Sequence, residues 1–209
     1  MPRILIFANG ELPNMEKAHA LVKADDYIIC ADGGTHHALA LGLRPKLIIG
    51  DLDSVTDAEL KKANAKIVKY PRNKNETDLE LALNHALEQK PTSILIIAAL
   101  GNRLDQTLGN ISLLSDSRLA TLDVRLDDGV EEVFFCRDSS RVEGRRADIV
   151  SLIPWNGAVE GIRTNGLRWP LNNETLYPEK TRGISNEMLE AVAEVSIEVG
   201  SLLITHRRL

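Results

Sequence analysis

Aspartate residues follow the ends of most apolar runs in the first 126 residues of the chain. They are Asp32, Asp51, Asp53, Asp78 and Asp105. Runs that are apolar throughout predict strands of a parallel sheet, and the loops after such strands meet at one edge, where open α/β sheets bind ligands. Carboxylates gathered there repel one another unless a cation compensates their charge. Because Mg²⁺ prefers oxygen ligands and bridges carboxylates to substrate phosphates, the pattern predicts a Mg²⁺ site.

Three of these acids have a spacing that suits metal binding. Asp51 and Asp53 are two residues apart, so an extended backbone would turn both to the same side. Asp78 follows Thr77, a candidate helix N-cap, and the helix dipole favours the ionised form that a metal ligand needs. Each feature alone is also common in solvated loops and helix caps. Their occurrence together at one edge favours a metal and phosphate site over these separate explanations.

Cationic and small residues occur at the same predicted edge. Lys74 and Arg103 supply positive charge, while Gly33 and Gly34 would let backbone N–H groups at a helix start approach a phosphate closely. Nucleotide phosphates with Mg²⁺ are the simplest ligands that use all of these residues. The common nucleotide-binding glycine motifs are absent from the sequence, and its histidines and cysteines lack zinc-ligand spacing.

The elements expected to position these residues alternate between strand and helix. The predicted strands are 3–8, 27–31, 46–49, 66–69, 93–99 and 121–126. The predicted helices are 35–41, 57–64, 78–89 and 105–115, and two of them start with a capping-box pattern at Thr56 and Thr77. This alternation predicts an α/β domain with a parallel sheet over residues 1–128.

The pattern changes in residues 129–209, where turn residues separate short strand-like runs. These runs are 131–137, 148–153, 158–163, 189–197 and 201–205. Residues 186–194 also show near-helical spacing, and we favour a strand because a hairpin-like return follows. The prediction is a smaller all-β domain.

Composition and charge exclude several classes of protein. The 209 residues carry 30 Asp and Glu against 25 Lys and Arg, with 44% hydrophobic residues, which is ordinary for a globular protein. The net charge of -5 and the short basic pairs, including the tail 206–208, do not favour nucleic-acid binding. Cys30 and Cys136 lie in apolar runs and are expected to be buried thiols. No apolar stretch reaches the ~20 residues of a membrane helix and no signal peptide is recognised, so we expect a cytoplasmic protein.

Several segments resemble one known family in both order and spacing. ADGG (31–34), PKLIIGDLDS (45–54), KNETDLELAL (74–83) and GNRLDQTLGNISLL (101–114) are similar to the catalytic domain of thiamine pyrophosphokinases. The segments 151–176 and 182–187 resemble that family's thiamine-binding β domain. The resemblance covers nearly the whole chain, which makes it far more specific than any single motif.

The resemblance implies an α/β (Rossmann-like) nucleotide-binding domain joined to a β-sandwich. It further implies a homodimer that transfers a diphosphate from ATP to thiamine and releases AMP, with a thiamine cleft completed by the partner subunit. Carried over by position, it makes Asp51, Asp53, Asp78 and Asp105 the catalytic carboxylates, and it makes the first three the Mg²⁺ ligands. The implied ATP-binding residues are Asn9, Asp32, Gly33, Gly34, Lys74, Thr77 and Arg103. The implied thiamine-binding residues are Trp169, Ser185 and Asn186.

Three positions depart from the family pattern. Asn75 stands where an acid is usual, Gln106 where a histidine is common and Asn102 where a glycine is usual. The first two reduce the charge and proton-transfer capacity near the predicted site. A catalytically weak homologue, a non-catalytic thiamine or nucleotide sensor, or an enzyme for a different alcohol therefore remain alternatives. A phosphohydrolase with Asp51 as nucleophile is a further one.

Overall fold

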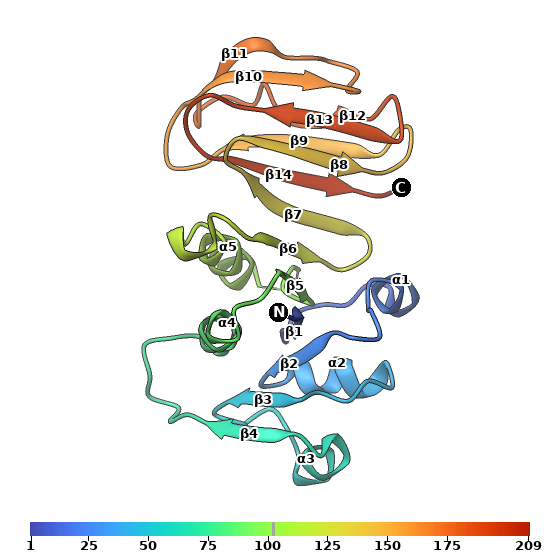
Figure 1. Cartoon of the computed structure of the whole chain (residues 1–209), viewed down its shortest axis with the longest axis vertical. Coiled ribbons are helices and arrows are strands. Elements are labelled where there is room, and N and C mark those ends of the chain that lie inside the picture. The colour runs from blue at the N-terminus through green and yellow to red at the C-terminus, as the bar shows by residue number, and fades with distance from the viewer. Residues whose placement is uncertain (102) are drawn as a thin grey trace. The chain divides into compact units, whose positions relative to one another are not determined.

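The protein divides into two compact units, Met1–Gly129 and Val130–Leu209, in a computed structural model that describes residues 1–101 and 103–209 (Figure 1). Within the described residues, the helices are too short or too polar to cross a membrane.

The first unit is built on a parallel sheet with the strand order β6-β5-β1-β2-β3-β4. Its strands are β1 (Arg3–Phe7), β2 (Tyr27–Ala31), β3 (Leu47–Gly50), β4 (Lys66–Lys69), β5 (Ser93–Ile97) and β6 (Asp123–Asp127). The chain runs outward from β1 to β4 and then returns to pair β5 with the other side of β1. The carboxyl ends of β1 and β5 therefore flank the point where the strand order reverses, which is where such sheets bind ligands.

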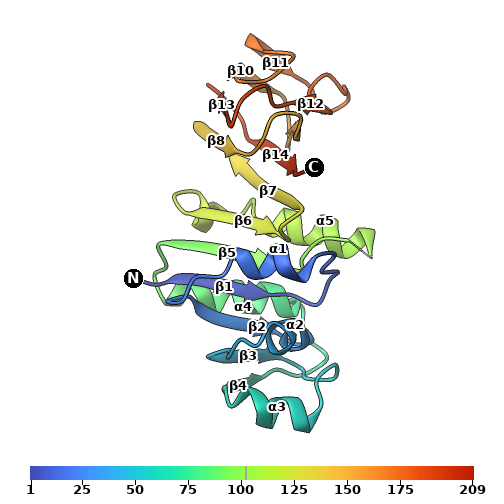
Figure 2. The same ribbon diagram turned by 90° about the vertical axis from the view of Figure 1, so that its right-hand side faces the viewer.

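Helices cover both faces of this sheet (Figures 1 and 2). They are α1 (Met15–Ala20), α2 (Gly34–Ala40), α3 (Asp57–Ala63), α4 (Asp78–Glu88) and α5 (Leu104–Leu113), followed by a short 3₁₀ turn, η1 (Ser117–Leu119). Ala18, Ala38 and Ala63, one from each of α1 to α3, share one apolar cluster with strand residues such as Leu5 and Ile48. Neighbouring residues of a strand point to opposite faces of the sheet. On the face opposite α1 to α3, α4 packs against β1, β2 and β3.

The predicted strands and four of the helices match the observed elements, but α1 was not predicted. Asn14 caps α1 by accepting a hydrogen bond from the Lys17 N–H at 2.9 Å, and Ala18 is the buried residue of this six-residue helix. A helix this short shows no apolar periodicity in the sequence. At α3 the full capping box forms between Thr56 and Glu59.

The second unit contains two antiparallel sheets. One has the order β12-β9-β14-β7, formed by β7 (Glu131–Cys136), β9 (Ile149–Pro154), β12 (Asn186–Glu187) and β14 (Leu202–Arg207). The other has the order β11-β10-β13-β8, formed by β8 (Ser139–Glu143), β10 (Val159–Asn165), β11 (Asn172–Leu176) and β13 (Val192–Ser196). This is the β-sandwich that the resemblance implied.

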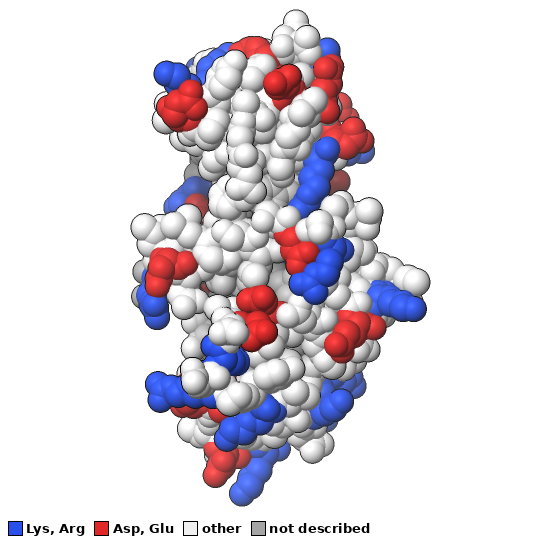
Figure 3. Space-filling view, turned by 90° about the vertical axis from the view of Figure 1, so that its left-hand side faces the viewer, with Lys and Arg blue, Asp and Glu red and all other residues white. Residues whose placement is uncertain are grey.

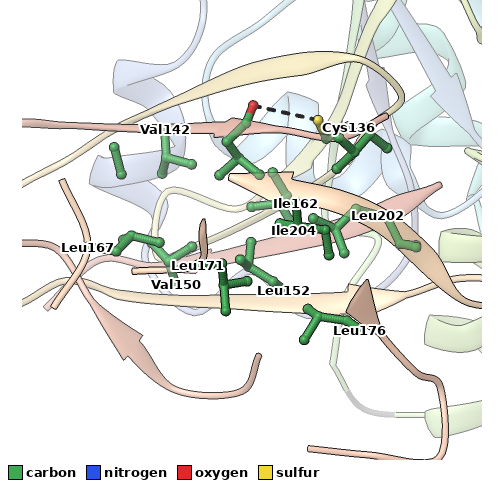
Figure 4. Close-up of a cluster of buried hydrophobic side chains, with 14 of the residues drawn as sticks. Cys136, Val142, Val150, Leu152, Ile162, Leu167, Leu171, Leu176, Leu202 and Ile204 are labelled. Carbon is green, nitrogen blue, oxygen red and sulfur yellow. Dashed lines mark hydrogen bonds between the residues drawn. The ribbon is translucent and has the colours of Figure 1, made fainter. Parts of the chain in front are cut away.

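Apolar side chains from both sheets form the core of the sandwich (Figure 4). Leu152, Leu202 and Ile204 come from one sheet, and Val142 and Ile162 from the other, each at most 1% exposed. The Cys136 thiol donates to the Val195 carbonyl at 3.9 Å and bridges the two sheets (Figure 4). Cys30 and Cys136 are both free and buried, and burial raises the pKa of both thiols.

Three features of the second unit differ from the predictions. The strands β8, β11 and β12 were not recognised, because they are short and carry mostly polar residues. The strand favoured over a helix at 189–197 is confirmed as β13, but β13 begins only at Val192, and residues 186–187 form the separate strand β12. The tail is not simply solvated. His206 lies in β14, between β7 and β9, where it is fully buried with Glu132 and Asp148 at 3.3 and 3.1 Å.

Charged side chains of both signs are interspersed over the face in Figure 3, including around α3 and β4 at its lower end. Clustered cations are the usual requirement for binding nucleic-acid phosphates. The absence of nucleic acid among the partners stays a prediction.

Candidate active site

A cavity of about 500 Å³ lies at the carboxyl edge of the parallel sheet. Its walls come from the loops that follow β1, β2, β3 and β5 and from the first turns of α4 and α5. The lining side chains and backbone belong to Ala8, Asn9, Gly10, Ala31, Asp32, Asp51, Asp53, Ser54, Lys74, Thr77, Asp78, Leu79, Ala99, Gly101, Arg103, Gln106 and Asn110. Most of the residues predicted to bind metal and ATP thus share one cavity.

Three carboxylates converge in this cavity. Asp32, Asp51 and Asp78 each place an oxygen so that the three atoms lie within 4.8 Å of one another. Asp32 is only 6% exposed, and its Oδ1 is buried without a hydrogen-bond partner among the described residues. A buried, unsatisfied carboxylate oxygen is costly unless a ligand satisfies it.

The backbone at the strand ends brings these acids together. Asp32 has a φ of 43° and its N–H donates to the Ile49 carbonyl at 2.9 Å, which fixes the end of β2 against β3. Gly50 has a φ of 149°, and a Cβ there would lie 3.0 Å from both Asp32 Cβ and Asp78 Oδ1. A glycine at position 50 therefore allows the close approach of the three carboxylates.

Lys74 supplies the cation next to the acids. Its Nζ lies 2.9 Å from Asp78 Oδ1 and 3.9 Å from Asp51 Oδ2, and its side chain is 10% exposed. One ammonium thus contacts two of the three carboxylates, which leaves negative charge in the cluster for a further cation to balance. Burial raises the pKa of Asp78, an effect that the hydrogen bond and the charge of Lys74 oppose.

Asp53 lies apart from this cluster, although it lines the same cavity. Its side chain is about half exposed, 3.6 Å from the Arg72 guanidinium, and accepts a hydrogen bond from the Ser54 hydroxyl at 3.1 Å. The predicted metal set of Asp51, Asp53 and Asp78 therefore differs from the observed cluster, in which Asp32 takes the place of Asp53. The αL backbone of Leu52, with a φ of 64°, breaks the extended geometry that would align Asp51 and Asp53.

Asp105 also lies outside the cluster. It is exposed and forms a two-point ion pair with Arg103, whose Nε lies 3.1 Å from Asp105 Oδ1 and whose Nη2 lies 2.5 Å from Oδ2. The hydrogen bond from Arg103 lowers the pKa of Asp105. Arg103 lines the cavity and Asp105 does not, so the pair places the cation at the cavity wall.

The start of α2 packs closely against the end of β1. A Cβ on Gly34 would lie 2.0 Å from the Phe7 carbonyl oxygen, and a Cβ on Gly33 would lie 2.4 Å from Asn9 Cγ. The two glycines therefore admit the backbone of β1 and the Asn9 side chain. Thr77, the N-cap of α4, accepts from the Glu80 N–H at 3.2 Å and faces the cavity.

Two residues of α5 were not singled out as site residues from the sequence. Gln106 was noted only as a departure, and Asn110 was not noted, yet both line the cavity. The Asn110 side chain is buried and donates to the Ala99 carbonyl at 2.8 Å. Residues four apart lie on one face of a helix, so the spacing of Gln106 and Asn110 is a sequence signal that could have identified both. Asn102, the third departure, lies outside the described residues.

The second unit carries the residues predicted to bind thiamine. Trp169 is 46% exposed, and the Arg168 guanidinium lies 5.1 Å from the centre of its ring. Asn186 is buried: it accepts from the Trp169 N–H at 3.0 Å and donates to the Trp169 carbonyl at 2.7 Å. Ser185 has a φ of 58° and its N–H donates to the Ser151 hydroxyl at 3.0 Å. Asn186 thus fixes the backbone that presents the indole.

The residues in the cavity fit a divalent cation. The three converging ligands are carboxylate oxygens, which Mg²⁺ prefers, and Asp32 Oδ1 has no other partner among the described residues. The cavity is also large enough to hold phosphate groups next to the cation.

The fold and the cavity define a class: an α/β unit of the kind that binds ligands at the carboxyl edge of a parallel sheet, followed by a β-sandwich. Residues 18–126 match the family described as "Thiamin pyrophosphokinase, catalytic domain", and residues 140–204 match "Thiamin pyrophosphokinase, vitamin B1 binding domain". The chain therefore belongs to the thiamin pyrophosphokinase family.

Individual relatives agree with this assignment. A thiamine pyrophosphokinase of Bacillus subtilis (strain 168) is 33% identical over 182 residues, which cover 84% of each chain. A crystal structure of thiamine pyrophosphokinase from Bacillus subtilis covers 99% of both chains with a TM-score of 0.88 and 27% identity. The corresponding structure from Geobacillus thermodenitrificans has a TM-score of 0.84 and 27% identity, and covers 98% of this chain and 96% of its own.

Proposed function

We propose that this protein transfers a diphosphate group from ATP to the hydroxyl of thiamine, with Mg²⁺, and releases AMP. The observation that carries the proposal is the convergence of Asp32, Asp51 and Asp78 beside Lys74 in a cavity at the sheet edge, in a chain of this family. The three carboxylates would hold Mg²⁺, which neutralises charge on the phosphate oxygens when bound.

The reaction places two demands on the residues of the cavity. The thiamine hydroxyl oxygen attacks the β-phosphorus, the bond from that phosphorus to the bridging oxygen of the α-phosphate breaks, and AMP leaves with the bridging oxygen. Holding the two groups in line and balancing the phosphate charge are the main contributions a protein makes. The hydroxyl proton passes to a carboxylate, for which Asp78 and Asp53 are the two candidates.

We assign the remaining cavity residues to the nucleotide. Lys74 and Arg103 would contact phosphate oxygens, because both present a cation at the cavity wall. Gly33 and Gly34 would act indirectly, by admitting the Asn9 side chain and the end of β1, while Asn9 and Thr77 line the cavity as polar neighbours of the nucleotide. At the start of the loop after β3, the Asp51 carboxylate accepts from the Asp53 N–H at 3.2 Å, and Asp105 would act through Arg103.

The thiamine-binding role of the second unit is supported by the exposed Trp169. A cationic heteroaromatic ring stacked on an indole gains apolar burial and a cation–π attraction of ~0.5–2 kcal/mol. Asn186 and Ser185 would act mainly by fixing the loop that presents the ring. We also propose a homodimer in which the partner subunit completes the thiamine site, and a cytoplasmic location in keeping with two free, buried thiols.

One observation favours an alternative, a weakly active or non-catalytic thiamine or nucleotide-binding protein. Gln106 lines the cavity at the position where a histidine is common in the family, and it cannot take up a proton. Incubation of the purified protein with Mg·ATP and thiamine, followed by mass identification of both products, separates the two. Thiamine diphosphate and AMP in equal amounts support the enzyme. Thiamine binding by calorimetry with no AMP over hours supports the sensor.

A further inference from the structure

His36, on the first turn of α2, contacts the loop that carries Asp51 and Asp53. Its Nε2 lies 2.6 Å from the Ser54 carbonyl oxygen, and its Nδ1 lies 2.6 Å from Glu59 Oε1. A carbonyl and a carboxylate are both acceptors, so both ring nitrogens must carry a proton for both hydrogen bonds to form. The geometry therefore selects the imidazolium form.

The Glu59 carboxylate that faces His36 is itself fixed in place. Its other oxygen accepts from the Thr56 N–H at 3.0 Å and from the Thr56 hydroxyl at 2.6 Å, in the capping box of α3. His36 thus joins α2 to the loop after β3 and to the start of α3. The loop, residues 51–56, brings Asp51 to the cavity, and His36 contacts it at the Ser54 carbonyl.

We propose that His36 is a positioning residue that, in its doubly protonated form, holds the loop 51–56 in the conformation that presents Asp51 to the metal and the nucleotide. This inference rests on the proposed function for its effect on Mg·ATP. It goes beyond that function because His36 is not among the residues that line the cavity.

The charges around the ring support the protonated form. The groups that face His36 are Glu59 from α3, Asp32 from the end of β2, the Ser54 carbonyl and the neighbouring His37. The hydrogen bond to Glu59 is the main cause that raises the pKa of His36, and the Ser54 carbonyl and Asp32 act in the same direction. Hydrogen bonds from Thr56, together with that from His36, lower the pKa of Glu59 to about 2.

The sign of the pH effect follows from these shifts. Because the pKa of His36 is raised above its usual value near 6.5, the two hydrogen bonds are present below that value and are lost as the pH rises through the raised pKa. Glu59 remains ionised down to about pH 2, so it sets no limit in the neutral range.

The test compares His36→Gln, Glu59→Gln and a matched control, His85→Gln. His85 on α4 also pairs with a glutamate, Glu88 at 3.4 Å, but within its own helix. The affinity for Mg·ATP is measured by calorimetry without thiamine across pH 6 to 9, and loop mobility of the ligand-free protein by proteolysis within residues 51–56. The His36 ring is titrated by NMR in the wild type and in Glu59→Gln.

We expect His36→Gln to weaken Mg·ATP binding at pH 6.5 by roughly tenfold, ~1.4 kcal/mol, and to speed cleavage of the loop, with no change in His85→Gln. Glu59→Gln should lower the His36 pKa, so that loop cleavage accelerates at a lower pH than in the wild type. Unchanged loop cleavage in His36→Gln, or an equal effect of His85→Gln, would overturn the proposal. If His36 protects the loop from cleavage but neither the wild type nor any variant binds Mg·ATP, the proposed function is rejected instead. The two failures can be told apart because the loop assay needs no ligand.

Discussion

At the residue scale, the site combines buried carboxylates with a negative charge that is only partly compensated. Asp32 is nearly inaccessible, its Oδ1 has no hydrogen-bond partner among the described residues, and two more carboxylates lie beside it. Folding an isolated α/β unit around three like charges costs free energy, because one ammonium compensates only part of them. A protein can retain such a destabilising group of charges at a binding site, because the bound ligand balances the charge.

This conflict predicts opposite effects of Asp32→Asn on activity and stability. Loss of one metal ligand should lower kcat/KM by roughly 100-fold or more, as for other groups that stabilise transition-state charge. Removal of one of the repelling charges should leave the melting temperature of the ligand-free protein unchanged or raise it. Steady-state kinetics and thermal unfolding without Mg²⁺ measure the two effects. A melting temperature lowered by several degrees would show that Asp32 is a structural residue.

The two tryptophans provide a second test at this scale. Trp169→Ala should raise the KM for thiamine by roughly tenfold and the KM for ATP much less, because an exposed indole offers stacking area to a cationic ring. Trp155 instead packs edge-on against Phe135 at 5.6 Å between ring centres, so Trp155→Ala should mainly lower the melting temperature. Equal changes of both KM values in Trp169→Ala would contradict stacking.

At the element scale, the glycines at the start of α2 set how closely the helix approaches β1. In the first unit, the strand and helix periods in the sequence predicted most elements, since strands buried on both faces are apolar throughout. The three-carboxylate cluster was predicted only in part. The positive φ of Leu52, which separates Asp53 from Asp51, leaves no mark in the residue types. The local sequence also does not reveal that the Asn186 side chain forms hydrogen bonds with both the N–H and the carbonyl of Trp169.

Gly34→Ala and Gly109→Ala should change stability in opposite directions. The new methyl group at position 34 would lie 2.0 Å from the Phe7 carbonyl oxygen, so we expect a loss of about 1–3 kcal/mol in unfolding free energy. Gly109 lies on the exposed face of α5 with nothing within 4 Å, and alanine there should gain ~0.5–1 kcal/mol. Urea unfolding of both variants measures the difference. A neutral Gly34→Ala variant would contradict the packing at this helix start.

At the scale of the whole molecule, the two units carry different parts of the proposed reaction. The carboxylates and Lys74 belong to the first unit, and Trp169 belongs to the second. The sequence pattern changes from strand–helix alternation to short strands near residue 128, and this change is the basis for predicting a domain boundary there. In the proposed homodimer, the carboxylates of one subunit and Trp169 of the other would form one site.

Mixed dimers test this arrangement. If each site takes its carboxylates from one subunit and its indole from the other, an Asp51→Asn and Trp169→Ala mixture should regain activity after denaturation and joint refolding. Random pairing makes half of the dimers mixed with one intact site in each, about a quarter of the wild-type sites. Activity is measured at thiamine concentrations too low for Trp169→Ala alone. No regain, in a sample shown to be dimeric by sedimentation, would contradict a shared site.

The fate of labelled phosphates tests the central claim most directly. ATP carrying ³²P in either the α or the γ position is incubated with Mg²⁺, thiamine and the protein, and the products are separated. Because the β- and γ-phosphates move together, we expect the γ label in thiamine diphosphate and the α label in AMP. Recovery of the γ label as inorganic phosphate with thiamine unchanged, or in thiamine monophosphate with ADP as the other product, would contradict the account.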